Sequence, residues 1–285
     1  MNDTDRGPLL SAAGLDATVA VTAIDENGRT RNGHIAAERP LTLYLDKREI
    51  VTLMTLGVHP ELLVLGWLRN QRLIPSLEHI ARVQIDWETD AAAVTTRHGV
   101  DGLEERLAHR TVTTGCGQGT VFGRLMDELD QIRLAAPNVR QSTLHALLDN
   151  LSRHNQVYRK AGAVHGCALC TGSGIDLFIE DVGRHNAVDA IAGEMWLRDT
   201  PGHDKLFYTT GRLTSEMVIK VAQMGIPVLL SRSGITEMGL RLGRQLGVTL
   251  IARAKGRHFL VYNGARNILF DRADAASPHV LREGS

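Results

Sequence analysis

Short segments with strand-like alternation of apolar and polar residues open the chain. This alternation predicts β-strands over three segments of the first half: residues 17–24, 41–45 and 50–54. Residues 59–73 differ, because the leucines and Trp67 recur at helical spacing behind Pro60, which suits a first helical turn. Strand character returns over residues 80–96. The first half is therefore predicted to be rich in strands, with one helix.

Strands and helices alternate in the second half. Helical periodicity over residues 121–134 and 142–155 leads into this region, with Pro137 between the two. Glycine follows each of the last two predicted helices, at Gly225 and Gly247, as is common at helix C-termini. The pattern predicts strands at 175–179, 205–209, 227–230, 248–252 and 259–262, and helices at 185–197, 214–224 and 236–246.

This order of elements predicts the α/β class, because helices with one apolar face must cover a sheet. We expect a strand-rich N-terminal subdomain over residues 16–135 and an α/β core over residues 140–270. Residues 1–15 and 271–285 are expected to be poorly ordered tails.

Composition and charge narrow the class of protein. The 285 residues are 43% hydrophobic, enough for a sizeable core, and 32 basic residues balance 32 acidic ones. A net charge of zero gives no global attraction to nucleic acid or to an anionic membrane, so anion binding must be local. No apolar run approaches twenty residues and no secretory signal precedes the first strand, so we expect a cytoplasmic protein. Three cysteines cannot build a disulfide framework.

Cys116 is the first candidate for chemistry. Glycines flank it in the run TVTTGCGQG, and free N–H groups of such a loop can stabilise a thiolate. A thiolate is a nucleophile. The alternative is a turn that holds one small apolar residue. The residues alone leave both interpretations open.

His165, Cys167 and Cys170 form a second candidate group with the spacing H-x-C-x-x-C. This spacing suits zinc or a redox dithiol. The glutamate that follows histidine in the H-x-E motif of zinc deaminases is absent, however. We therefore favour small buried residues at the start of a helix, and expect no bound metal.

A dense polar group follows the predicted strand 175–179. Ligands of α/β folds gather at the carboxyl ends of strands, and backbone N–H groups at a helix start bind anions. A salt-bridged helix cap is the plainer alternative, but it needs fewer hydrogen-bonding groups than are present here. Asp181 and Asp189 are candidates to orient the imidazole or to accept from a guanine-like ring. The predicted binding residues of this group are Asp181, Arg184, His185 and Asn186, and His165 of the preceding group is predicted to bind with them.

Basic loops follow three successive predicted strands. Each of the first two combines an arginine, hydroxyl groups and a glycine ahead of a helix, an arrangement that binds anions without a complete P-loop. Each loop alone can be explained as solvated charge, whereas three at one sheet edge form a stronger signal. The candidate residues are Arg212 and Ser215, then Ser231, Arg232 and Ser233, and finally Arg253, Ala254, Lys255, Gly256, Arg257 and His258.

Several of these stretches resemble the FdhD family of formate dehydrogenase accessory sulfurtransferases. The resemblance covers about residues 38–270, and it is carried by EDVGRHNAVD, GRLTSEMVIK, GIPVLLSRS and LGVTLIARAKGR. Members of that family carry Cys-Gly-x-Cys where this chain has Cys116-Gly117-Gln118-Gly119. Ala190 replaces a usual lysine, and only part of a Thr-Gly-Gly-x-His motif is kept before His165.

The resemblance implies a cytidine-deaminase-like three-layer core and a homodimer. It further implies a sulfur carrier that takes sulfur from a cysteine desulfurase as a persulfide on Cys116. The sulfur would pass to the molybdenum bis-molybdopterin guanine dinucleotide cofactor before formate dehydrogenase receives it, with residues 253–258 in contact with the guanine dinucleotide. That cofactor is then a substrate, and no cofactor is expected to stay bound.

Three alternatives remain open at this point. Loss of the second loop cysteine fits a divergent chaperone that binds the cofactor without moving sulfur. Cys167 or Cys170 would otherwise supply the partner thiol that Gly119 no longer provides. The third alternative is a zinc-dependent hydrolase that uses His165, Cys167 and Cys170.

Overall fold

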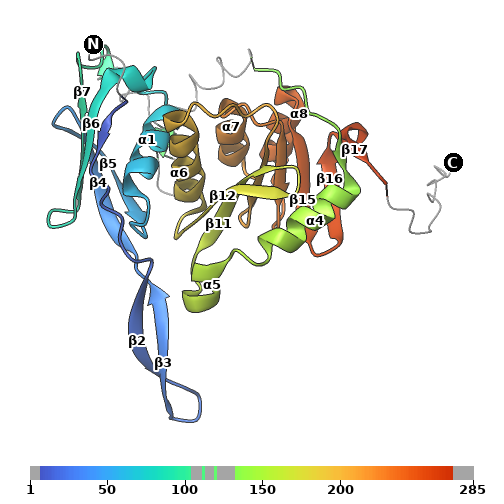
Figure 1. The fold of residues 1–285 in the computed structure, drawn as a ribbon, viewed down its shortest axis with the longest axis horizontal. Helices are drawn as coiled ribbons and strands as arrows, with labels where there is room; N and C mark the ends of the chain where they lie inside the picture. Colours follow the sequence, from blue (N-terminus) through green and yellow to red (C-terminus); the bar gives the residue numbers. More distant parts are fainter. Residues whose placement is uncertain (1–6, 104–110, 113–118, 121–131, 272–285) are drawn as a thin grey trace.

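Two β-sheets lie on either side of a pair of helices, α1 (Pro60–Asn70) and α6 (Arg184–Leu197) (Figure 1). The computed structural model describes residues 7–103, 111–112, 119–120 and 132–271. The fold is mixed α/β, and the predicted order of elements is confirmed for the main strands and helices of both halves.

The N-terminal sheet has five strands in the order β1-β6-β7-β4-β5. Leu41, Leu43 and Leu45 of β4 are fully buried, as the alternation in the sequence predicts. Its elements are β1 (Leu9–Leu10), β4 (Arg39–Leu45), β5 (Arg48–Thr55), β6 (Ile80–Asp86) and β7 (Ala91–Thr96), with the 3₁₀ turn η2 (Leu77–His79) before β6.

The second sheet has six strands in the order β12-β11-β13-β14-β15-β16, and its three central strands β13, β14 and β15 are parallel. Its strands are β11 (His165–Thr171), β12 (Gly174–Asp181), β13 (Leu206–Thr209), β14 (Val228–Ser231), β15 (Thr249–Lys255) and β16 (His258–Asn263). The crossover helices are α7 (Ser215–Gln223) and α8 (Glu237–Leu246). Their boundaries lie within about three residues of the predicted ones.

Helices cover both faces of this second sheet. Phe207, Leu229 and Leu250 belong to one hydrophobic cluster with α6, α7 and α8, whereas Leu206, Tyr208 and Leu230 belong to another with α4 (Gln141–Leu151). The core is therefore three-layered. The first cluster continues through α1 into the N-terminal sheet, so one hydrophobic core joins both halves.

Helices α1 and α6 cross at two glycines. A Cβ atom added to Gly193 would overlap the carbonyl oxygen of Leu62, and one added to Gly66 would overlap that of Asp189. The two backbones thus lie closer together than any side chain would permit. Arg69 Nη1 donates to the Ala192 carbonyl oxygen (3.0 Å) near the same crossing.

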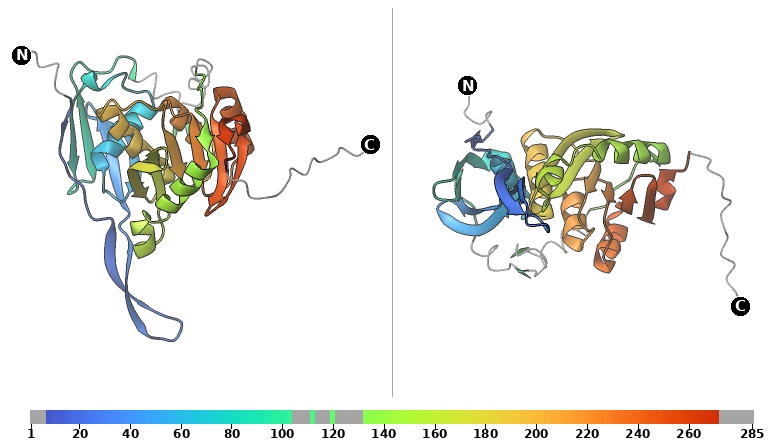
Figure 2. Two further views of the ribbon diagram at one scale, coloured as in Figure 1. Left: turned by 45° about the vertical axis from the view of Figure 1, so that its right-hand side comes forward. Right: turned by 90° about the horizontal axis from the view of Figure 1, so that it is seen from below.

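A two-stranded hairpin, β2 (Thr18–Ile24) with β3 (Thr30–Ala36), projects from the body of the molecule (Figures 1 and 2). Only its base meets the short helix α5 (Gln156–Ala161). The strand β3 is absent from the elements predicted above, because a strand that faces solvent on both sides has no apolar alternation to reveal it.

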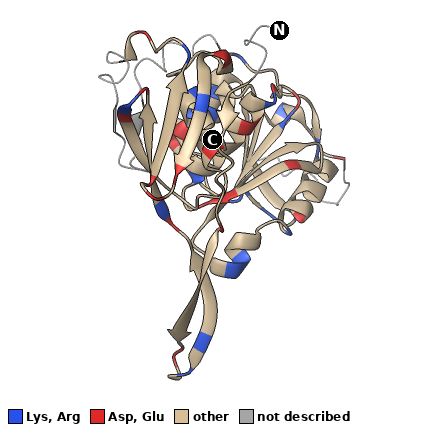
Figure 3. Ribbon diagram, turned by 60° about the vertical axis from the view of Figure 1, so that its left-hand side comes forward, with Lys and Arg blue, Asp and Glu red and all other residues tan. Residues whose placement is uncertain are grey.

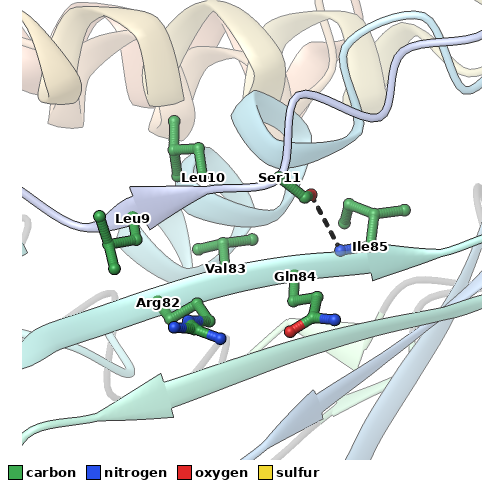
Figure 4. A pocket seen from close by; sticks show the side chains of 7 residues that line it. All are labelled: Leu9, Leu10, Ser11, Arg82, Val83, Gln84 and Ile85. Carbon is green, nitrogen blue, oxygen red and sulfur yellow. Dashed lines mark hydrogen bonds between the residues drawn. The ribbon is translucent and has the colours of Figure 1, made fainter.

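The expected N-terminal tail is wrong for residues 7–15. Leu9 and Leu10 pair with Arg82 and Val83 of β6, and Ser11 Oγ accepts from the Ile85 amide (3.0 Å) (Figure 4). Ser11 Oγ and the Ala13 amide in turn donate to Glu61 Oε1 (2.7 and 2.6 Å). These hydrogen bonds hold the segment on the sheet edge, where it shapes a shallow pocket with β6.

Several other predicted boundaries also need correction. The helix predicted over 142–155 ends at Leu151, and α5 follows it. Residues 165–171 form a strand rather than the start of a helix. Of the helix predicted over 121–134, residues 121–131 lie outside the described residues and 132–134 are not helical. The remaining elements are β8 (Thr111–Val112), β9 (Gly119–Thr120), β10 (Val139–Arg140), the 3₁₀ turn η3 (Ala265–Asn267) and β17 (Ile268–Leu269).

Basic and acidic residues are interspersed over the ribbon (Figure 3). Within the described ranges, no helix combines the length and hydrophobicity needed to span a bilayer.

Candidate functional site

The loops that follow β13, β14 and β15 meet at one edge of the second sheet. The Arg232 amide donates to the Thr209 carbonyl oxygen (3.1 Å), and the Arg253 amide donates to that of Ser233 (2.8 Å). Ser231 Oγ donates to the Gly211 carbonyl oxygen (2.6 Å). Parallel pairing of the three strands places their carboxyl ends together. The structure therefore brings the three predicted basic loops side by side.

The basic side chains of these loops face solvent, whereas some of their neighbours have structural roles. Ser231 and Ala254 are buried, and Ser233 and Ser215 are partly buried. The exposed cations available to an anion are Arg212, Arg232, Arg253, Lys255 and Arg257. The third loop, unlike the first two, does not lead into a helix.

Residues 253–258 instead form the end of the β15–β16 hairpin, in which Lys255 pairs with His258. Gly256 has a φ of 59°, which suits glycine, but Arg253 also adopts a positive φ of 53°. The arginine is thus held in a conformation that side chains seldom adopt. Such local strain is typical of functional segments.

His165 extends the basic edge to the neighbouring strand β11. Its Nδ1 lies 3.3 Å from Thr210 Oγ1, and the same hydroxyl accepts from the Gly166 amide (3.0 Å). Burial lowers the pKa of His165, and the nearby Arg184 lowers it further. The imidazole is therefore neutral at pH 7 and can donate or accept a hydrogen bond.

Asp181 and Asn186 connect the two halves of the molecule. The Asp181 carboxylate accepts from Thr55 Oγ1 (2.6 Å), the Leu56 amide (3.2 Å) and Asn186 Nδ2 (2.9 Å), and also from the Gly183 amide. Asn186 Nδ2 also donates to the Met54 carbonyl oxygen (2.6 Å). Burial raises the pKa of Asp181 against the effect of these donors. Both side chains are thus occupied by internal hydrogen bonds.

Asp189 is likewise unavailable to a ligand. It is fully buried and accepts from Lys220 Nζ at 2.6 and 2.8 Å and from Asn70 Nδ2 at 2.6 Å. Burial raises the pKa of Asp189, and the Lys220 ammonium opposes this effect. The prediction that Asp181 or Asp189 accepts from a guanine-like ring is therefore wrong, because packing buries both carboxylates among protein donors.

A cavity of about 350 Å³ lies between β5 and the start of α6. His165, Arg184, His185 and Asn186 line it, so four of the predicted binding residues lie around one space. The N-terminal half contributes the remaining wall with Glu38, Thr52, Leu53 and Met54. These four residues are not predictable from the sequence, since no local pattern indicates that a strand about 130 residues earlier faces the start of α6.

Arg184 links this cavity to the basic edge. Its side chain passes over Gly211, where an added Cβ would lie 2.6 Å from Arg184 Cδ. The Nε of Arg184 is buried and has no hydrogen-bond partner among the described residues. The cavity and the basic loops consequently form one continuous candidate site.

The cysteines of the H-x-C-x-x-C group point to opposite faces of the sheet. Cys167 packs in the cluster with α6 and α7, whereas Cys170 packs in the cluster with α4. Burial raises the pKa of each thiol to about 12. Neither residue can serve as the partner thiol, and the residues described by the structure include no group of three His, Cys, Asp or Glu side chains suited to a metal.

Cys116 lies outside the described residues. Its flanks are described, and they pair as an antiparallel ladder in which Thr111 faces Thr120 and Val112 faces Gly119.

Comparison with known proteins identifies the family of the chain. The model of the FdhD/NarQ family matches residues 36–269, which is most of the chain. The chain belongs to the FdhD/NarQ family.

Relatives from several bacteria agree with this FdhD/NarQ assignment. The chain is 29% identical over 239 residues to the sulfur carrier protein FdhD of Bacillus pumilus, a match that covers 84% of this chain and 91% of the relative. It is 30% identical to the protein of that name from Geobacillus kaustophilus, with 85% and 94% coverage. A crystal structure of a formate dehydrogenase accessory protein from Desulfotalea psychrophila superposes with a TM-score of 0.69 at 27% identity, covering 88% and 98% of the two chains.

The buried His185 makes the stability of this FdhD/NarQ protein depend on pH. It is buried, its Nε2 lies 3.3 Å from Glu216 Oε2, and burial together with Lys220 and Arg184 lowers its pKa to about 2. The folded state thus keeps the imidazole neutral, whereas the unfolded chain binds a proton below about pH 6.5. Stability supplied by His185 is therefore present above that pH and is lost as the pH falls.

When the pH is lowered from 7 to 5, we expect the free energy of unfolding to fall by about 2 kcal/mol because of His185. Urea denaturation at both pH values measures it. In a His185→Gln variant the difference between the two pH values should shrink by that amount, whereas His203→Gln at an exposed histidine should leave it unchanged. Equal pH dependence of wild type and His185→Gln would contradict the assignment.

Proposed function

We propose that this chain is a sulfur carrier that serves formate dehydrogenase. Relatives that match over most of their length are named sulfur carrier protein FdhD, and a solved relative is described as a formate dehydrogenase accessory protein. The geometric support is the meeting of three basic loops and a cavity at one edge of the sheet, which suits a large anionic substrate.

Sulfur is received on Cys116 in this proposal. The Cys116 thiolate attacks the outer sulfur of a persulfide on a cysteine desulfurase. A new S–S bond forms on Cys116, the S–S bond of the donor breaks, and the donor cysteine leaves as a thiolate. Delivery of the sulfur as sulfide then needs two electrons from a second thiol, which ends in a disulfide with Cys116. Because Cys167 and Cys170 are buried and Gly119 replaces the second loop cysteine, that thiol comes from another molecule.

The acceptor is the molybdenum bis-molybdopterin guanine dinucleotide, bound as substrate. Its phosphates lie on the loops of Arg212, Arg232 and Arg253, where exposed guanidinium groups and backbone N–H groups bind anions. The observation that carries this assignment is the direct hydrogen bonding between successive loops, from Arg232 to Thr209 and from Arg253 to Ser233.

We also propose that the three-layered half is a cytidine-deaminase-like core and that the working unit is a homodimer. The support for the first is the six-stranded sheet with helices on both faces. The support for the second is the family to which the chain belongs.

One observation favours a second function. Gly119 removes the paired cysteine of the loop, and this departure fits a chaperone that binds the molybdenum cofactor without moving sulfur. Both functions use the same basic edge, so they differ only at Cys116.

Mass spectrometry after incubation with a cysteine desulfurase and cysteine tests the proposal. Wild type should gain an adduct of one sulfur atom on Cys116, and Cys116→Ala should gain none. Cys167→Ala is the control, since a buried thiol whose pKa is about 12 stays protonated at neutral pH and should not carry sulfur. A wild-type protein that binds guanosine diphosphate but never forms the adduct would favour the chaperone.

A further inference from the structure

Among the described residues that line the cavity between β5 and α6, Glu38 is the single acidic one. It precedes β4 and is exposed. Within the described part of the chain, no hydrogen bond or ion pair engages its carboxylate. The two carboxylates of the neighbouring motif, Asp181 and Asp189, are fully engaged by protein donors. Glu38 is therefore the acceptor that remains for a ligand in this cavity.

Donors lie around the same cavity. No described side chain caps the first turn of α6, a helix of 14 residues, and within the described part of the chain the backbone N–H groups of Arg184 and His185 donate to no acceptor. Arg184 adds a guanidinium whose buried Nε has no partner among the described residues, and His165 adds a neutral imidazole. The cavity thus combines one anionic acceptor with several donors.

A ring that offers two adjacent N–H donors beside a carbonyl oxygen complements this arrangement. The 2-amino-4-oxopyrimidine ring, which guanine and pterins share, presents a ring N–H and an amino group that one carboxylate can accept together. Its carbonyl oxygen needs a donor of the kind found at the α6 start. The leucine, methionine and valine of the lining suit the ring faces, and about 350 Å³ lies at the lower end of the usual range for small-molecule sites.

We propose that Glu38 is a specificity-determining residue that accepts hydrogen bonds from a 2-amino-4-oxopyrimidine ring of the substrate. This inference rests on the proposed function, since that function supplies a substrate with guanine and pterin rings. It adds an acceptor from the N-terminal half, so the binding site needs residues of both sheets. Arg184 lies where the ring and the phosphates of one nucleotide meet.

Calorimetric titration of the full chain with guanosine diphosphate and inosine diphosphate tests this assignment. Inosine lacks the amino group, so wild type should bind it about ten-fold or more weakly, as expected for loss of a hydrogen bond to a charged group. In Glu38→Gln the affinity for guanosine diphosphate should fall by about that factor, and the preference for guanosine diphosphate over inosine diphosphate should largely disappear. Neopterin as a competitor shows whether the pterin ring also enters the cavity in a Glu38-dependent manner.

Two further variants distinguish a failure of the proposed binding site from a failure of the Glu38 assignment. Glu88→Gln changes an exposed carboxylate in the turn between β6 and β7, outside the cavity, and should keep the full preference for guanosine diphosphate. Arg232→Ala should weaken the binding of both nucleotides by the same factor, because it removes a contact to the phosphates. If wild type binds neither nucleotide, the proposed site and the inference fail together. If Arg232→Ala weakens binding but Glu38→Gln retains the preference for guanosine diphosphate, only the inference about Glu38 is overturned.

Discussion

Gly193→Ala should destabilise the protein by about 3 kcal/mol or more, or prevent folding altogether. An alanine in place of glycine in a helix normally stabilises by about 1 kcal/mol, so helix propensity alone predicts the opposite sign. At this position the new Cβ would overlap the Leu62 carbonyl oxygen and lie 2.9 Å from the Gly66 amide nitrogen. Both obstacles are backbone atoms of α1, which cannot rotate away.

Urea denaturation followed by circular dichroism measures this effect. Gly33→Ala is a suitable control, because a Cβ there meets no atom within 4 Å and its φ is not positive. We expect that variant to stay within about 0.5 kcal/mol of wild type. A Gly193→Ala protein as stable as wild type would mean that α1 and α6 are not in contact at this crossing.

Lys220→Met should destabilise the protein by about 3–5 kcal/mol at pH 7. The substitution preserves most of the side-chain volume but leaves Asp189 fully buried with Asn70 as its remaining donor. A buried carboxylate without its counter-charge must either stay ionised in an apolar environment or take up a proton, and both cost free energy. Because Lys220 is on α7 and Asn70 is on α1, the loss loosens three helices at once.

Lys205→Met is the matched control. Lys205 also forms ion pairs, 3.6 Å from Asp176 and 3.4 Å from Asp204, but both carboxylates are well exposed, so we expect a loss below about 1 kcal/mol. The double variant Asp189→Leu/Lys220→Met should recover most of the stability, because an apolar pair replaces the ion pair. A loss for Lys220→Met no larger than for Lys205→Met would show that Asp189 is not buried as described.

The alternation from β13 to β15 illustrates what local patterns can predict. Strands β13 and β14 are short, fully buried and mostly apolar, β15 begins in the same way, and each helix carries one apolar face and ends near a glycine. These signals depend only on neighbouring residues, so the sequence predicts them well. The three basic loops were found in the same manner, since they follow directly from the ends of those strands.

The cysteine pair shows where local patterns fail. Residues three apart share a face on a helix but point to opposite faces of a strand. The segment 165–171 is buried on both sides of the sheet for most of its length, so it shows no alternation, and it resembles the start of a buried helix. On a helix, Cys167 and Cys170 would lie on one face and could form a joint site. Because the segment is a strand, the two side chains lie on opposite faces of the sheet and cannot form one.

By itself, the sequence determined the family, the order of the main strands and helices, and the placement of arginines after three successive strands. These features depend on spacing between near neighbours. Only the tertiary structure decided which carboxylate is free for a ligand, that two glycines let α1 and α6 touch, and that Glu38 shares a cavity with Arg184. The physical reason is that burial and hydrogen bonding depend on partners distant in the chain, and no local pattern records which distant segment will pack against a given side chain.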